Sequence, residues 1–173
     1  AAAHAIYAGA STDRVTYPTD VMLFPLVFVW RHAIELALKE IIRLGVYVET
    51  GEAYVPPKKP NHDLAELWTN AKPHIIATNP DQPNHPWLAN AEDCITRVDE
   101  VDPYADGFRF DMNRDHTAPT LAKLPPLVNL RQAHEALRAT TNFLSGVRAE
   151  LMGRADWVTE MRAAHESAAH ESE

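Results

Sequence analysis

Residues 19–45 read TDVMLFPLVFVWRHAIELALKEIIRLG, and this stretch decides the fold class. Apolar side chains recur in it at spacings of three and four residues: Leu23, Val27, Trp30, Ile34, Leu38 and Ile41. This spacing places them along one face of an α-helix. Thr19 or Asp20 is available as the N-cap, and Gly45 as the stop. The first half is apolar on every side, so we expect it at the centre of a bundle or against another subunit.

Pro25 lies inside this predicted helix. A proline in a helix interior removes one backbone hydrogen bond and bends the helix, whereas a proline in the first turn is well tolerated. We therefore favour a helix that begins near Leu23, with Pro25 in its first turn. The alternative is an earlier start with a bend at Pro25.

Two shorter helices are predicted after a Pro-rich connection. Asp63 and Glu66 have the spacing of a capping box, and the apolar residues after them lie on one face of a second helix. Pro73 marks its end or a kink. Helical spacing returns in residues 87–102, WLANAEDCITRVDEVD, and predicts a third helix.

The last helix is predicted after Pro125 and Pro126, which suit a first turn. Leucines recur along it at intervals of seven residues: Leu130, Leu137, Leu144 and Leu151. Gly153 is a position where this helix could be interrupted. The tail from residue 154 ends in a repeated AAHES and has little apolar surface, so we expect it to fray.

Residues 102–126 have turn residues and no helical period, which predicts a long irregular loop with at most a short strand. The predicted fold is therefore all-α: an antiparallel up-and-down bundle of four to five helices, with this long irregular loop before the last long helix. Residues 1–153 form the expected single domain. Residues 154–173 form a C-terminal tail, helical or frayed.

The composition is that of an ordinary globular protein. Its 173 residues are 46% hydrophobic and 23% charged, which suffices for one buried core. The net charge of −8 disfavours broad coating of nucleic acid but not a small basic pocket. A single cysteine, Cys94, excludes a disulfide framework. We expect a cytoplasmic protein without a membrane span, because the apolar run 21–30 is shorter than the about twenty residues that cross a bilayer.

Nine histidines raise the question of a metal site. Neither the Glu-x-x-His spacing of di-iron bundles nor the His-Glu-x-x-His motif of zinc enzymes occurs in the chain. We therefore expect no metal and no cofactor. A metal-dependent bundle enzyme, built from distant histidines, is the third-ranked function. His134, on the apolar face of the last helix, is expected to be a hydrogen-bonded core histidine.

The polar cluster that most needs an explanation lies on the first helix. Arg31 and Glu35 share one face directly after the most apolar segment, and His32 is adjacent. Pairs at this spacing contribute about 0.2–0.5 kcal/mol on an isolated helix, but charges next to a buried segment need partners. His62 and Asp63, at the start of the second helix, are the expected partners. We predict that these five residues form a structural or binding cluster.

Four segments together resemble bacterial members of the HEPN superfamily (higher eukaryotes and prokaryotes nucleotide-binding), from about Pro18 to Leu151. The segments are WRHAIELALKEIIRLG at 30–45, NHDLAELW at 61–68, DGFRF at 106–110 and LVNLRQAHEALRATTNFLSGV at 127–147. The resemblance implies an antiparallel helical bundle and dimerisation through the early helices. It also implies links to RNA cleavage in toxin–antitoxin, CRISPR and phage-defence systems.

Catalytic members of that superfamily carry an Arg and a His separated by four to six residues, which meet across a dimer and act without metal on a ribose 2′-hydroxyl. Arg109 and His116 match this spacing. On this hypothesis His116 is the general base or acid, and Arg109 stabilises the charged phosphorane-like state. The competing hypothesis makes Arg109 a buried anchor against Glu35 or Asp63.

Two functions follow from these observations. The leading one is a HEPN-like protein linked to RNA or nucleotide metabolism, a metal-independent ribonuclease of stress or phage defence. The alternative is a non-catalytic helical interaction or dimerisation module, such as a partner or antitoxin-like component. For both we expect a homodimer and no membrane. RNA or a nucleotide is the expected ligand in the first case, and a partner protein in the second.

Overall fold

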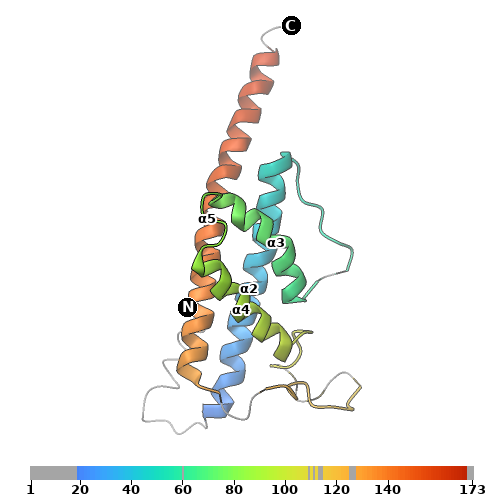
Figure 1. Ribbon diagram of the computed structural model, residues 1–173. Helices are drawn as coiled ribbons and strands as arrows, with labels where there is room; N and C mark the ends of the chain where they lie inside the picture. The colour runs from blue at the N-terminus through green and yellow to red at the C-terminus, as the bar shows by residue number, and fades with distance from the viewer. Residues whose placement is uncertain are drawn as a thin grey trace.

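The computed structural model describes residues 19–59, 61–108, 110, 112, 115–124 and 128–170. Four α-helices account for most of them: α2 (Thr19–Thr50), α3 (Leu64–Thr78), α4 (Pro86–Val101) and α5 (Leu130–His170). The all-α fold and the long gap before a long last helix are confirmed. The two long helices, α2 and α5, lie side by side, and α3 and α4 pack against them (Figure 1).

The direction of the helices departs from the predicted up-and-down order. Trp30 of α2 bonds to His134 of α5, and Glu40 further along α2 bonds to Arg148 further along α5. Residue numbers therefore rise together, and α2 and α5 run parallel. This parallel pair is also visible as two ribbons that ascend from the same end of the molecule (Figure 1).

The connection between α2 and α3 is the physical reason for this order. Residues 51–59 and 61–63 return along α2 without helical structure, so that α3 begins beside the middle of α2 and also runs parallel to it. An extended chain advances about 3.3 Å per residue and a helix about 1.5 Å, so this short segment is long enough to go back over about half of α2. Within the described chain, α4 alone runs against its neighbours. Between α3 and α4, Leu64 bonds to Asp99 and Lys72 bonds to Glu92, so residue numbers rise in one helix as they fall in the other.

The expected start of the first helix near Leu23 is wrong. The helix α2 begins at Thr19, so Pro25 lies in its interior and not in its first turn. Pro25 is exposed, whereas its neighbours Leu26 and Val27 are buried. The missing N–H therefore falls on the solvent side, where packing of the opposite face holds the helix together.

The expected stop at Gly45 is also wrong, because α2 continues to Thr50. Gly45 is buried against α3, and a Cβ at this position would lie 2.2 Å from Cγ of His74. Its role is close packing between helices. The residue that ends α2 is Gly51, which has a φ of +70° and whose N–H donates to the carbonyl of Tyr47 at 2.8 Å.

The two middle helices begin as predicted. The carboxylate of Asp63 accepts a hydrogen bond from the N–H of Glu66 at 2.8 Å, which makes Asp63 the N-cap of α3. This helix continues through the exposed Pro73 to Thr78. The ring of His85 accepts from the N–H of Trp87 and caps α4, which begins at Pro86.

The last helix begins at Leu130, after Asn129, whose side chain accepts from the N–H of Gln132 at 3.1 Å. Pro125 and Pro126, which we expected in the first turn, lie outside the described residues. Gly153 does not interrupt the helix, and the tail is helical to His170 rather than frayed. Leu151 and Ala155 are still buried at the start of this stretch, and the hydroxyl of Thr159 bonds to that of Tyr47 of α2.

One core joins the four helices, with its largest fully buried apolar residues drawn from each of them: Leu26, Ile34, Leu38, Ile41, Leu64, Ile95, Leu144 and Leu151. The long loop adds Phe108 to this core and holds one isolated bridge, between Met112 and Pro119. Among the described residues, no helix is both long enough and apolar enough to cross a membrane.

Candidate functional site

The buried guanidinium of Arg31 joins three parts of the chain. Arg31 lies in the middle of α2 and is 1% exposed. Its Nη1 donates to Oε2 of Glu35 at 3.2 Å, and its Nη2 donates to the carbonyl of His62 at 2.9 Å. Its Nε donates to the carbonyl of Asp102 at 3.2 Å. The start of α3 and the end of α4 are thus both fastened to α2 through one side chain.

Asp102 completes the charge balance around this guanidinium. Its Oδ2 lies 3.5 Å from Nε of Arg31, and both side chains are almost fully buried. Its Oδ1 accepts from the N–H groups of Asp106 at 3.0 Å and Gly107 at 2.9 Å, which fixes the first turn of the loop after α4. A Cβ at Gly107 would lie 2.4 Å from Cδ2 of Leu121 and 3.2 Å from this oxygen, so the glycine permits the close approach.

Glu35 is the second buried charge of the site. Its Oε1 accepts from Nζ of Lys39 at 2.6 Å and from Nδ1 of His62 at 2.9 Å. Burial alone raises the pKa of Glu35, but the hydrogen bonds from Lys39 and His62 outweigh it, so the pKa lies below its ordinary value. Glu35 is therefore a buried carboxylate with a positive side chain on either side of it, Arg31 and Lys39.

The imidazole of His62 is the solvent-exposed edge of the cluster. Its side chain is 52% exposed, whereas that of Glu35 is 4% exposed. A charged carboxylate only accepts, so the Nδ1 of His62 carries the proton and the Nε2 of the neutral ring keeps its lone pair. Within the described chain, Nε2 has no hydrogen-bond partner. The hydrogen bond to Glu35 therefore fixes the orientation of the ring and presents its Nε2 to solvent.

The structure brings together three of the five residues predicted for this cluster: Arg31, Glu35 and His62. Asp63 is adjacent but caps α3, and its carboxylate is directed to the N–H of Glu66. His32 is exposed and stacks on Phe28, with ring centroids 6.2 Å apart. Sequence analysis missed Asp102, although an Asp at the end of a helix, followed by a turn with Gly107, was a visible signal.

The second predicted site pairs Arg109 with His116, and the structure describes only one of these two residues. Arg109 lies outside the described residues. His116 is exposed in the long loop, in the left-handed region with a φ of +54°. His134 is a buried core histidine as predicted, because its Nδ1 accepts from Nε1 of Trp30 at 3.3 Å.

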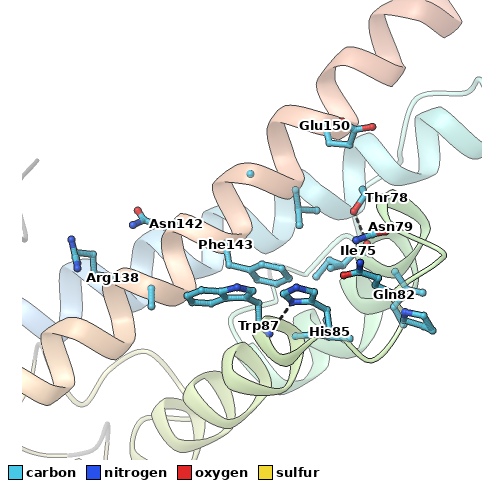
Figure 2. Close-up of a pocket in the computed structure, with 16 residues that line it drawn as sticks. Ile75, Thr78, Asn79, Gln82, His85, Trp87, Arg138, Asn142, Phe143 and Glu150 are labelled. Atoms are coloured by element: carbon cyan, nitrogen blue, oxygen red, sulfur yellow. Dashed lines mark hydrogen bonds between the residues drawn. The ribbon is translucent and has the colours of Figure 1, made fainter.

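A separate pocket of about 580 Å³ opens between α5 and the turn that joins α3 to α4. Figure 2 shows the rings of Trp87, His85 and Phe143 close together in it, with Arg138 and Glu150 at opposite ends. Trp87 is 51% exposed. The pocket is a mostly apolar hollow with aromatic walls and charged ends, which suits an apolar or aromatic group.

A second pocket, of about 690 Å³, lies between α4 and α5 and adjoins the first. We call the two pockets together the groove. The two pockets share Trp87, Ala139 and Phe143. The second contains the thiol of Cys94, whose pKa is raised by burial. A thiol of this kind stays protonated and is a poor nucleophile or metal ligand.

Among the described residues, no three His, Cys, Asp or Glu side chains are grouped so as to hold a metal ion. Comparison of the chain with protein-family models, curated proteins and solved structures gave no match.

Proposed function

We propose that the chain acts on RNA through His62, as a HEPN-like, metal-independent ribonuclease of stress or phage defence. The observation that carries the proposal is the 2.9 Å hydrogen bond between the exposed imidazole of His62 and the buried carboxylate of Glu35. A carboxylate in this position fixes the tautomer of a catalytic histidine and stabilises the imidazolium that forms. The choice of RNA as substrate rests on the HEPN resemblance.

In the proposed reaction, Nε2 of His62 takes the proton of a ribose 2′-hydroxyl. The 2′-oxygen then attacks the adjacent phosphorus, and the bond to the 5′-oxygen breaks, which leaves a 2′,3′-cyclic phosphate. The imidazolium returns its proton to the departing 5′-oxygen. No metal is required, because one base that becomes an acid serves both steps.

Positive charge beside His62 supports a phosphate-containing substrate. Nζ of Lys39 shares Oε1 of Glu35 with the imidazole, and the side chain of Lys39 is 35% exposed. Lys58 and Lys59, both exposed, precede His62 by four and three residues. These cations lie close to His62 in the sequence and oppose the net charge of −8, which favours contact with a phosphate backbone.

The test is cleavage of single-stranded and hairpin RNA in the presence of a chelator. His62→Ala is expected to lower the rate by about 10²–10⁴-fold, the usual contribution of a general base. The fold should survive this change, because Arg31 bonds to the backbone carbonyl of His62 and not to its ring. His32→Ala is the matched control, since His32 is exposed on the same helix as Glu35.

His116→Ala separates the two candidate bases. If His116→Ala abolishes cleavage and His62→Ala does not, the catalytic site is the pair predicted from the sequence, Arg109 and His116. If the wild-type chain cleaves no RNA while it is folded, the proposed reaction is wrong.

A second candidate function is favoured by a different observation, the exposed apolar surface of α5. Trp157 is 61% exposed and Met161 is 40% exposed. Both follow Arg154, whose guanidinium donates to carbonyls at the end of α3. Exposed aromatic groups beside an apolar pocket are typical of protein interaction surfaces. We therefore also propose that the bundle serves as an interaction module through α5.

A further inference from the structure

One face of α5 carries both an open pocket and an exposed tryptophan. The following residues succeed one another at three- and four-residue spacing and so form one row along the helix: Phe143, Gly146, Glu150, Gly153, Trp157 and Met161. The first three line the aromatic pocket. The last two are exposed, 61% for Trp157 and 40% for Met161. The pocket and the exposed side chains therefore form one continuous surface.

The middle of this row is open to a neighbouring helix. A Cβ added at Gly146 or at Gly153 would meet no atom within 4 Å. The distance between two packed helices depends on the side chains at their contact, so glycines here allow a close approach. Ala149, between them, is small and exposed.

The charged side chains beside this row indicate which kind of helix would bind to it. Arg138 lies at one end of the pocket, and Asp156 and Glu160 lie beside Trp157. All three are exposed and have no ion-pair partner within the described part of the chain. A helix that placed acidic groups at Arg138 and basic groups at Asp156 and Glu160 would match this pattern. An antiparallel copy of α5 has that charge order.

We propose that α5 pairs with α5 of a second copy of this chain, antiparallel about a two-fold axis near Ala149 and Glu150. Trp157 and Phe143 are equidistant from residue 150, so the partner's Trp157 arrives at the aromatic pocket beside Phe143. Arg138 then faces the partner's Asp156 and Glu160. The proposal deepens the interaction function of α5 by naming the partner, and it is independent of the chemistry at His62.

The geometry is self-consistent for a symmetric dimer. The contact is isologous, because each copy supplies one tryptophan and one pocket. Glu150 would approach its own counterpart at the axis, but each Glu150 already accepts from Nε of Arg154 at 2.9 Å, which neutralises it. A parallel pairing would instead place Arg138 against the partner's Arg138, and neither Trp157 would reach the aromatic pocket of the other copy.

The test is the mass of the full chain in solution, measured by sedimentation over a wide concentration range. The wild type is expected to dimerise. Trp157→Ala is expected to raise the dissociation constant at least about 30-fold, as the loss of a buried tryptophan anchor does. Met152→Ala is the matched control: Met152 is 46% exposed on a different face of the same helix and should change nothing.

Charge reversal tests the orientation. Arg138→Glu alone is expected to weaken the dimer, and its combination with Asp156→Lys and Glu160→Arg in one chain is expected to restore it. A wild-type chain that is monomeric at every concentration overturns the proposal, as does a dimer that Trp157→Ala leaves intact or a pocket occupied by a different protein. The result does not depend on RNA cleavage, so failure here and failure of the His62 chemistry are separately visible.

Discussion

The buried carboxylate of Glu35 accepts a hydrogen bond from the half-exposed imidazole of His62 at 2.9 Å. His62 donates this bond through its ring, and its backbone carbonyl accepts a second bond, from Arg31. Ring and backbone thus perform separate tasks: the carbonyl fastens α3 to α2, and the ring presents its Nε2 to solvent. Substitutions of the ring and of Arg31 therefore distinguish chemistry from stability.

Arg31→Ala is expected to destabilise the fold by about 3–5 kcal/mol, because it leaves the buried carboxylates of Glu35 and Asp102 without their shared cation. Urea unfolding followed by circular dichroism measures this loss. Arg97→Ala is the control, since Arg97 forms the same four-residue pair with Asp93 on an exposed helix surface and should change stability little. Equal stability of Arg31→Ala and the wild type would mean that the cluster does not hold the helices together.

Glu35 gives stability a specific dependence on pH. Its pKa in the folded chain is below the ordinary value of 4.5, despite burial, because Lys39 and His62 donate to it. The charged form therefore stabilises the fold at pH values above the ordinary pKa, and this contribution is lost as the pH falls below it. The difference in unfolding free energy between the wild type and Glu35→Gln should be constant near neutrality and shrink in acid. A difference that grows in acid would contradict the assignment.

Asp99 is expected to behave in the opposite way. Burial raises its pKa above the ordinary 3.8, although the N–H of Leu64 donates to its Oδ1 at 3.0 Å. Its ionised form is thus a cost to the folded state above the raised pKa, and the cost disappears on acidification. Asp99→Asn keeps an oxygen for Leu64 and removes the charge, so it should be more stable than the wild type at neutral pH. The gain should vanish in acid; a variant less stable at all pH values would refute this.

The helices and the core of the site were predictable because their signals are local. Apolar spacing over residues 23–41 predicts the long helix without knowledge of its neighbours. Arg31 and Glu35 are four residues apart, and charges beside a buried segment need partners. His62 was predicted from that requirement alone, and the structure places it against Glu35.

The features that were missed depend on residues far apart in the sequence. The parallel order of α2, α3 and α5 results from the course of the return segment 51–63, which no helical period encodes. Asp102 meets Arg31 across 71 residues. Gly45 resembled a helix stop, but its small size serves a contact with His74, which only the packed structure reveals.

That contact gives a test of packing between α2 and α3. Gly45→Ala would place a Cβ 2.2 Å from Cγ of His74, so one helix must shift; overpacking of this kind costs about 1–3 kcal/mol. Gly153→Ala is the contrast, because a Cβ there meets nothing and should stabilise the helix by about 0.5–1 kcal/mol. Both changes are compared by denaturant unfolding at low protein concentration in a Trp157→Ala background, which weakens the proposed self-association. A stabilising Gly45→Ala would show that His74 can move away freely.

Cys94 reports whether the second groove pocket admits small molecules. Burial raises the pKa of its thiol, and the side chain lines that pocket beside Thr140. Because Cys94 is the sole cysteine, labelling by a thiol reagent reports on this one position. We expect slow labelling of the folded chain and rapid labelling in denaturant, since the thiolate is scarce and shielded in the native state. The free energy of opening, obtained from the ratio of the two rates, should fall when Arg31→Ala loosens the bundle. Labelling of the native chain at the unfolded rate would mean that the groove between α4 and α5 is open to solvent.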